Sequence, residues 1–392
     1  MGTRPEIIKM APVYYALKKT ELSPLILHTG QHDALAEASY RFFNMQPDYE
    51  FDLGRERNTL GHLFAIMMER LDQLFATLDI SAVLVQGDTS SALSGALSAF
   101  FHKIPVGHIE AGLRSHHDYE PYPEEKNREL IARLGKWHFV PTQKAMKNLA
   151  NEGIPKDNCY LVGNTIVDSV NWTLQHIEES SFNPEPGTLR LMEWLDSNGE
   201  NIRLVLVTAH RRESWDGQIS EITRGIKALA EKFPDLRIIW PVHPNPVVKN
   251  AVYEAIQGLD TGTKKHVQLC EPLNYPDMLY FLKRSWLVLT DSGGLQEEAV
   301  TLNIPVLVLR DRTERPEVIE AHGGALIGTS SRSIMDWVSR LYNDDNQYKS
   351  FRNTKDLYGD GNTGRHIAEI LQDSLVENTR SIDAVDLAEG YE

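Results

Sequence analysis

The chain has 392 residues, 41% of them hydrophobic and 24% charged, with a formal net charge of −15 at pH 7. This acidic balance argues against broad binding to nucleic acids or anionic membranes, which needs a basic surface. Local arginines can still bind a small anion. The two cysteines have no CxxC spacing, which argues against a disulfide scaffold or a cysteine-based zinc site. No apolar signal segment or membrane-length run is visible, so we expect a cytoplasmic protein.

Short β-rich runs alternate with longer segments of helical apolar spacing along the chain. This alternation is typical of parallel, doubly wound α/β sheets. Between the strands, residues 60–78 and 90–102 have helical spacing. The expected strands are 25–28, 82–86, 105–109, 137–140 and 160–162, followed by 204–208, 237–240, 267–269, 286–289, 306–309 and 325–327.

The two halves of the chain share a plan. "AVLVQGDTSSALSGALSAFFHKIPV" and "WLVLTDSGGLQEEAVTLNIPV" both contain a strand, an Asp, a small hydroxyl residue, a helix and Ile-Pro-Val. The length exceeds one ordinary core, so we predict two Rossmann-like domains facing across a cleft suited to a phosphate ligand. The expected bounds are 1–165 and 166–355, a helix at 356–375 that returns to the first domain, and a disordered acidic tail at 376–392.

The start of the chain departs from this plan. "GTRPEIIKMAP" looks like a glycine loop that opens a helix, and such a loop should follow a strand, yet Met1 alone precedes it. We therefore expect either that the first strand is missing from this chain or that the start is an internal methionine. Arg4 and Lys9 in this segment would clamp a phosphate, and the alternative is a surface charge cluster.

Three acids of the first domain are candidates for chemistry. Asp88 and Glu110 end neighbouring strands, and Glu124 begins a helix after Pro123. Adjacent parallel strands would bring the first two acids to one sheet edge. Converging carboxylates repel and raise at least one pKa, which suits proton transfer. The alternative is a set of solvated helix-capping acids.

The second domain carries a candidate phosphate site. Ser292, Gly293 and Gly294 follow a strand and open a helix whose N–H groups can approach a pyrophosphate, and Glu298 could accept ribose hydroxyls. The alternative is an N-cap without a ligand. His210 and His243 each follow a strand and would face the same ligand. The alternative for His210 is a polar loop with an internal Arg–Glu pair, and the alternative for His243 is a structural histidine. No GxGxxG follows a strand and no P-loop occurs, so a dinucleotide fingerprint is absent.

These pieces together resemble the UDP-N-acetylglucosamine 2-epimerase family of the non-hydrolysing type. The motifs that carry the resemblance span residues 2–361 in order. They are "GTRPEIIKMAPV", "TGQH", "VQGDTSS", "HIEAGLRS", "PYPEEKNR", "GNTIVD", "HRRES", "PVHPN", "EPLNY", "DSGGLQEEA", "RDRTERPE" and "YGDG".

The resemblance implies a two-domain fold similar to the GT-B glycosyltransferases, with the active site between the domains. It implies interconversion of UDP-GlcNAc and UDP-ManNAc at C2, by elimination of UDP to a 2-acetamidoglucal and re-addition to the other face. No metal or other cofactor is implied. A homodimer that supplies ManNAc-type sugars for surface polysaccharide synthesis is the expected context.

Site residues are carried over position by position. The catalytic positions fall on Asp88, Glu110, Glu124 and His210. The substrate-binding positions fall on Arg4, Lys9, Arg114, His243, Leu273, Ser292, Gly293, Gly294 and Glu298. Among these, Leu273 would lie beside the uracil, and Arg114 would be a supporting charge. Gln31 and His32 match a candidate allosteric site, although Ile66 stands where activated members carry an arginine. Ala209 replaces a usual glycine.

Four alternatives remain. A hydrolysing epimerase would release UDP and N-acetylmannosamine, and a related epimerase would act on another UDP-2-acetamido sugar. A GT-B glycosyltransferase is disfavoured by the three acids. A non-catalytic nucleotide-sugar-binding protein is disfavoured because all the candidate acids and His210 are present.

Overall fold

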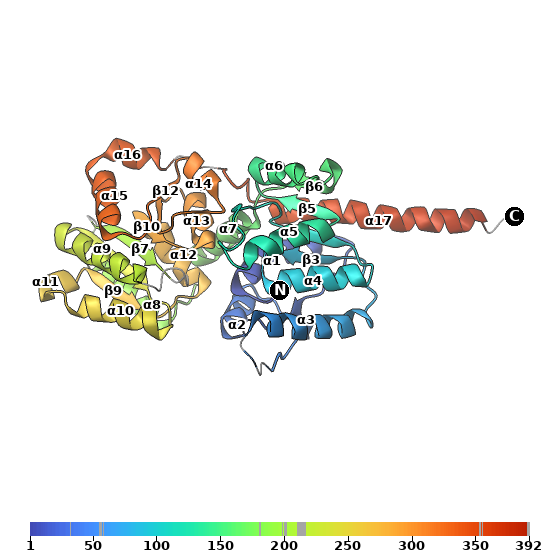
Figure 1. The fold of residues 1–392 in the computed structure, drawn as a ribbon, viewed down its shortest axis with the longest axis horizontal. Coiled ribbons are helices and arrows are strands. Elements are labelled where there is room, and N and C mark those ends of the chain that lie inside the picture. Colours follow the sequence, from blue (N-terminus) through green and yellow to red (C-terminus); the bar gives the residue numbers. More distant parts are fainter. Residues whose placement is uncertain are drawn as a thin grey trace. The chain divides into compact units, whose positions relative to one another are not determined.

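The chain divides into two compact units in a computed structural model. It describes residues 1–31, 33–54, 57, 59–179, 182–197, 199, 202–209, 217–352, 354 and 356–389. One unit, here the N-terminal domain, contains Met1–Ser169 and Tyr358–Glu392, and the other, the C-terminal domain, contains Val170–Leu357. Each domain has a parallel β-sheet covered by helices (Figure 1). The expected α/β class with two Rossmann-like domains is therefore confirmed.

Two parallel sheets make up the strand layer of the N-terminal domain within the described residues. The four-stranded sheet has the order β3-β4-β5-β6, and the two-stranded sheet pairs β1 with β2. Their bounds are β1 Leu27–His28, β2 Tyr49–Glu50, β3 Val83–Gln86, β4 Val106–Ile109, β5 Trp137–Val140 and β6 Cys159–Leu161. The sequence pattern missed β2, because two residues are too few to show a strand period.

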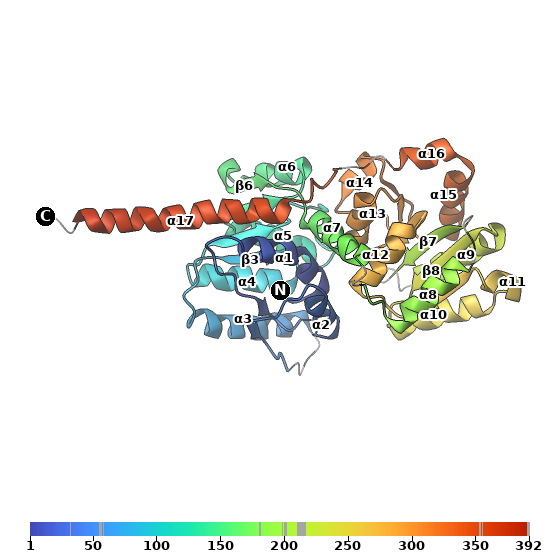
Figure 2. The same cartoon turned by 180° about the vertical axis from the view of Figure 1, so that it is seen from behind.

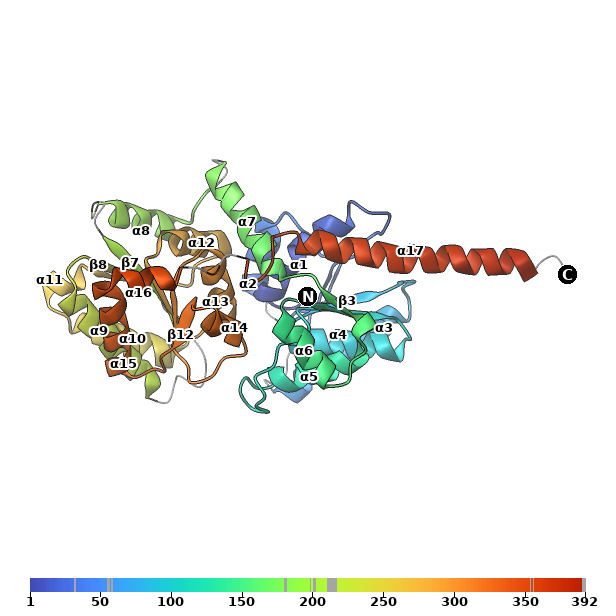
Figure 3. The same ribbon diagram turned by 90° about the horizontal axis from the view of Figure 1, so that it is seen from above.

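The helices of the N-terminal domain cover both faces of the four-stranded sheet. They are α1 Arg4–Leu17, α2 Asp33–Phe42, α3 Leu60–Phe75, α4 Ser90–Phe101, α5 Glu124–Leu134, α6 Gln143–Asn151, the short 3₁₀ helix η1 Lys156–Asn158, and α17 Thr363–Glu389. One core cluster joins α1 and α17 to one sheet face, and a second joins α3, α4 and α5 to the other (Figure 3).

The C-terminal helix packs on the N-terminal domain. The helix α17 runs beside α1 (Figure 2), and Ile367 and Leu371 of α17 lie in one core cluster with Val13 of α1. The helix continues to Glu389, whereas the sequence analysis expected a disordered tail from residue 376. The physical reason is that no glycine or proline interrupts residues 365–389, and Ala, Leu, Glu, Gln and Arg, which favour helices, recur along this stretch.

The C-terminal domain has one six-stranded parallel sheet in the part of the chain that is described. Its order is β12-β11-β10-β7-β8-β9, which is the doubly wound order 3-2-1-4-5-6 read from the other edge. The strands are β7 Arg203–Thr208, β8 Leu236–Pro241, β9 Val267–Cys270, β10 Leu287–Thr290, β11 Val306–Val308 and β12 Gly324–Leu326. This order places a topological switch point between β7 and β10, where such folds bind ligands.

Helices flank this sheet, and α7 Thr165–Glu178 crosses the boundary between the domains. The others are α8 Pro186–Asp196, α9 Gln218–Lys232, α10 Pro246–Gln257, α11 Thr261–Lys264, α12 Tyr275–Arg284, α13 Gly293–Thr301, α14 Pro316–Glu320, α15 Ser331–Asn343 and α16 Asp345–Ser350. Among the described helices, none combines the length and the hydropathy that a membrane span requires.

The packing of α17 gives a first prediction. Leu371 is 2% exposed, so Leu371→Ala leaves a cavity in the core cluster and should lower the free energy of unfolding by about 2–5 kcal/mol. Urea unfolding measures this change. Glu369→Ala is the matched control, because Glu369 is exposed and pairs only at the surface with Arg365; its effect should stay below about 0.5 kcal/mol. Equal effects would contradict the packing of α17.

Candidate functional site

The carboxyl edge of β3 and β4 gathers acidic residues. Gln86 at the end of β3 lies opposite Ile109 at the end of β4 in the parallel register. Glu110 directly follows β4, and Asp88 follows β3 after Gly87. Both acids therefore lie at the carboxyl edge of the sheet. Asp88 is not the N-cap of α4, because Thr89 takes that place and accepts from Ala92 N.

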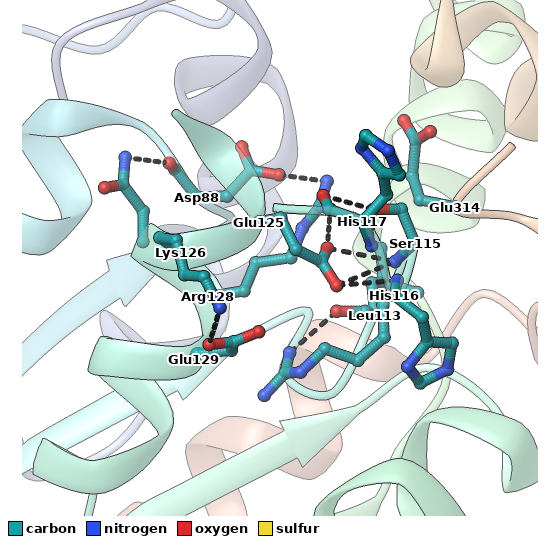
Figure 4. Close-up of polar contacts among 12 residues, drawn as sticks. Asp88, Leu113, Ser115, His116, His117, Glu125, Lys126, Arg128, Glu129 and Glu314 are labelled. Atoms are coloured by element: carbon teal, nitrogen blue, oxygen red, sulfur yellow. Dashed lines mark hydrogen bonds and ion pairs between the residues drawn. The ribbon is translucent and has the colours of Figure 1, made fainter. Parts of the chain in front are cut away.

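Arg128 on α5 links Asp88 to the rest of this edge. Its guanidinium pairs with the Asp88 carboxylate and, at 2.9 Å, with Oε2 of Glu125 (Figure 4). Asn127 Nδ2 also donates to the backbone oxygen of Asp88 at 2.7 Å. The start of α5 therefore holds Asp88 through both its side chain and its backbone.

Glu125 fixes the loop that follows β4. Its carboxylate accepts from Ser115 N and His116 N, each at 2.9 Å, and the residue is 1% exposed (Figure 4). A carboxylate with two N–H donors and an arginine partner is well compensated for its burial. The neighbouring Glu124, predicted to be catalytic, is the first residue of α5 and is half-buried. Glu125 therefore holds the loop, whereas Glu124 stays partly exposed.

Glu110 is held in an uncommon backbone conformation. Its φ is +65°, which few residues other than glycine adopt, and such strain is concentrated at functional sites. Lys9 Nζ pairs with Glu110 Oε2, and Gln86 Nε2 donates to the same oxygen. Lys9 was predicted to bind substrate, but the fold buries it to 4% exposure against Glu110. The fold brings Lys9 from α1 to β4, which sequence spacing does not reveal.

Two of the three predicted acids lie against cations in the structure. The sequence analysis treated the carboxylates as mutually repelling, but Asp88 faces Arg128 and Glu110 faces Lys9. This edge therefore presents acids held by cations.

The remaining predicted residues of the N-terminal domain have other surroundings. Arg114 donates to both oxygens of Glu152, at 2.6 and 2.9 Å, and to Leu113 O. This bidentate pair gives the guanidinium a partner within the protein. Gln31 Oε1 accepts from Ser91 Oγ at 2.8 Å. Arg4 is the first residue of α1 and is half-buried, and His32 lies outside the described residues.

Sequence reasoning missed His108, which lies two residues before Glu110 on β4. Its Nε2–H donates to the backbone oxygen of Gly87 at 2.8 Å, next to Asp88. Burial lowers the pKa of His108 to about 3, so the ring is neutral at pH 7. The neighbouring His138 on β5 is also buried, and its pKa is lowered to about 4. Two histidines on adjacent strands were visible in the sequence, but their hydrogen bonds were not.

In the C-terminal domain, the glycine loop stands at the start of α13. Ser292 is the N-cap, its Oγ accepting from Leu295 N, and its own N–H donates to Thr290 Oγ1 at 2.9 Å. A Cβ added to Gly293 would clash with Nη1 of Arg315, whereas a Cβ at Gly294 would meet open space. The loop therefore adjoins a guanidinium, and a helix N-terminus beside an arginine suits a phosphate group.

Arg315 is another residue whose role the sequence analysis did not assign, although it lies in the quoted motif "RDRTERPE". Its Nε donates to Glu297 Oε1, and its Nη1 donates to Glu314 Oε1, both at 2.5 Å. Glu297 is fully buried, and Arg310 donates to the second oxygen of Glu314 at 2.8 Å. These contacts hold the guanidinium against the glycine loop.

The other predicted residues of this domain lie in neighbouring loops and in α13. His243 follows β8, and its Nδ1 accepts from Asn245 N at 3.2 Å. Leu273 is buried just before α12, and Glu298 is 8% exposed in α13. His210 lies outside the described residues. No group of three or more His, Cys, Asp or Glu that could hold a metal ion occurs in the described part of the chain.

The neutral His108 leads to a prediction about acid stability. Its folded pKa of about 3 is below the ordinary value of 6.5, so its contribution to stability is present above pH 6.5. That contribution is lost as the pH falls from 6.5 toward 3, by at most about 1.4 kcal/mol per pH unit. The free energy of unfolding should therefore fall less steeply between pH 6.5 and 4 in His108→Gln than in the parent. Parallel urea-unfolding curves against pH would contradict this.

The two glycines of the loop lead to another prediction. Gly293→Ala places a methyl group on the Arg315 guanidinium, so we expect a loss of about 1–3 kcal/mol from overpacking. Gly294→Ala has open space and should leave stability unchanged or raise it by up to about 1 kcal/mol. Thermal unfolding of the two variants provides the comparison. A Gly293→Ala protein as stable as Gly294→Ala would show that Arg315 moves away without loss.

Comparison with known proteins gives consistent matches over the length of the chain. Residues 15–372 match the family model described as UDP-N-acetylglucosamine 2-epimerase. A UDP-N-acetylglucosamine 2-epimerase from Bacillus subtilis is 39% identical over 94% of this chain and 93% of its own. The structure of UDP-GlcNAc 2-epimerase from Neisseria meningitidis bound to UDP-GlcNAc has a TM-score of 0.87 at 35% identity, covering 94% of this chain and 97% of that one. The enzyme from Methanocaldococcus jannaschii, in complex with UDP-GlcNAc and UDP, has a TM-score of 0.78 at 34% identity, covering 94% and 97%.

Proposed function

Since this chain belongs to the UDP-N-acetylglucosamine 2-epimerase family, we propose that it interconverts UDP-GlcNAc and UDP-ManNAc by inversion at C2. The proposed route removes the C2 proton and breaks the bond between C1 and the diphosphate oxygen, which gives UDP and a 2-acetamidoglucal. UDP then adds back, and a proton returns to the other face of C2. The observation that carries the proposal is the edge where Asp88 and Glu110 are held by Arg128 and Lys9.

The acids of the N-terminal domain support the proton-transfer steps. General acid–base catalysis needs carboxyl groups in fixed positions, and it contributes about 10²–10⁴-fold to rates. Asp88 is held through its side chain by Arg128 and through its backbone by Asn127, while Glu110, whose φ is positive, pairs with Lys9. We propose Asp88, Glu110 and Glu124 as the acid–base set.

The glycine loop of the C-terminal domain supports binding of the diphosphate. Ser292, Gly293 and Gly294 offer the N-terminus of α13, and the Arg315 guanidinium adjoins Gly293. Glu298, which is buried in α13, is proposed for the ribose hydroxyls. We keep His243 and Leu273 as proposed UDP contacts, and we propose that His210 stabilises the departing diphosphate.

Two broader elements belong to the proposal. A homodimer that supplies ManNAc-type sugars for surface polysaccharides is the expected context of such an enzyme. The alternative is a hydrolysing epimerase. In that reaction water captures the intermediate, and free UDP accumulates with N-acetylmannosamine. Both activities need the same acids, so the product distinguishes them.

Proton NMR of the purified protein with UDP-GlcNAc in D₂O tests the proposal. We expect UDP-ManNAc to appear and deuterium to enter C2 of both epimers, because proton removal at C2 precedes re-addition. Accumulation of UDP with N-acetylmannosamine would support the hydrolysing alternative. Binding of UDP without any turnover would contradict an epimerase activity on this substrate.

The acid–base assignment predicts the effect of isosteric variants. Asp88→Asn, Glu110→Gln and Glu124→Gln should each lower kcat by at least about 100-fold, because each removes a group that gives or takes a proton. UDP binding, measured by calorimetry, should persist in all three. Glu129→Gln on the same helix is the control, since Glu129 pairs at the surface with Lys126, and its kcat should stay close to that of the parent. An acid variant with full activity would remove that residue from the set.

A further inference from the structure

The turn that carries Asp88 begins with a glycine in a left-handed conformation. Gly87 follows β3 with a φ of +70°, a region that favours glycine. A Cβ at this position would meet open space, so the backbone conformation accounts for the glycine, and crowding does not. Gly87 N donates to Ile109 O at 3.0 Å, which ties the start of the turn to the end of β4.

His108 on β4 holds the other polar backbone group of Gly87. Its Nε2 lies 2.8 Å from Gly87 O, and the ring is fully buried. A carbonyl oxygen accepts hydrogen bonds and cannot donate them, so Nε2 carries the proton. The Gly87 carbonyl belongs to the peptide bond that joins Gly87 to Asp88. His108 therefore holds the peptide group on the amino side of the acid.

The second ring nitrogen of His108 indicates that the ring is neutral. Among the described residues, none forms a hydrogen bond with Nδ1, which is buried. In the cation, Nδ1 would be a buried N–H donor without an acceptor, which is costly. Burial lowers the pKa of His108, and the charges of Arg114 and Arg128 act in the same direction. The ring thus supplies a hydrogen bond to the turn and keeps its proton on Nε2.

Two side chains of α5 hold Asp88 from the other side. Asn127 Nδ2 donates to Asp88 O at 2.7 Å, and the Arg128 guanidinium pairs with the carboxylate. Asp88 O belongs to the peptide group on the carboxyl side of the acid. The contacts from His108 and Asn127 together fix both peptide groups that flank Asp88, and both side chains are buried.

The distance between Asp88 and Glu110 depends on contacts beyond the β ladder. The register of β3 and β4 ends at the pair of Gln86 and Ile109, one residue before Glu110. Asp88 lies past this last pair, so the ladder alone does not set its position. His108 belongs to the same strand as Ile109, and its hydrogen bond extends the link between the two strands into the turn.

We propose that His108 is a positioning residue for the acid–base reaction: by donating to Gly87 O, it fixes the Asp88 carboxylate relative to Glu110. This inference rests on the proposed function, which assigns proton transfer to those acids. A displacement of about 1 Å can cost a reaction about 100-fold in rate. UDP binding is proposed for the C-terminal domain, so loss of the His108 hydrogen bond should lower kcat and leave the affinity for UDP unchanged.

Three variants of the full chain test this role. His108→Leu removes the donor, whereas His108→Gln keeps an N–H donor on a side chain of similar reach. His138→Leu is the matched control, because His138 lies opposite His108 on β5 and is also buried. The His138 ring hydrogen-bonds to the backbone of Gly135, which follows the last residue of α5 and is distant in sequence from Asn127 and Arg128. Both leucine variants should lower the Tm, because each leaves a backbone group without its partner.

Turnover of UDP-GlcNAc separates positioning from packing. We expect His108→Leu to lower kcat by about 30–100-fold, with KM and the calorimetric Kd for UDP within about threefold of the parent. His108→Gln should recover at least about fivefold of this loss, and His138→Leu should keep kcat within about threefold of the parent. Equal losses of kcat in the two leucine variants, or no recovery in His108→Gln, would overturn the proposal.

Crystal structures of the two leucine variants give a readout that needs no turnover. We expect the Asp88 carboxylate to shift by about 1 Å or more relative to Glu110 in His108→Leu, and to keep its place in His138→Leu. An unmoved Asp88 in His108→Leu would overturn the proposal. If the parent does not turn over UDP-GlcNAc, the proposed function fails, and these structures still decide whether His108 positions Asp88.

Discussion

The bridge that Arg128 forms between Asp88 and Glu125 is the interaction on which the acidic edge of the N-terminal domain depends. Glu125 needs it because a carboxylate that is 1% exposed is stable only when it is paired and hydrogen-bonded. Glu125 in turn holds Ser115 N and His116 N. One guanidinium thereby connects the loop after β3, the loop after β4 and the start of α5. Removing the Arg128 guanidinium would leave the buried Glu125 carboxylate without its ion-pair partner, which is strongly destabilising.

Similar buried pairs recur wherever the fold positions a candidate functional group. Lys9 holds Glu110 from α1, and Glu297 and Glu314 hold Arg315 against the glycine loop. In each case a buried charged partner contacts a group that is proposed to act on the substrate. Pre-positioned charges lose less free energy by reorganising during a reaction, which is why rigid surroundings favour catalysis.

Much of the architecture could be predicted from the sequence. The alternation of apolar strands and helices predicted the α/β class and eleven strands, which all occur close to the expected bounds. The pattern missed β2, and it placed the end of the last helix too early. Strand and helix periods are local properties, so the sequence displays them directly. Pairing order is a property of the whole domain, and the order of the C-terminal sheet became visible only in the structure.

The sequence by itself determined which residue types stand at the ends of the strands: the acids Asp88 and Glu110, and the small residues Ser292, Gly293 and Gly294. Tertiary structure decided how each of them is held. It assigned Lys9 to Glu110 rather than to an open surface, made Glu125 the buried anchor beside Glu124, and set Arg315 against Gly293. The physical reason is that ion pairs and hydrogen bonds act between residues that are close in space. Lys9 and Glu110 are 101 positions apart in sequence, and only the packing of α1 brings them into contact.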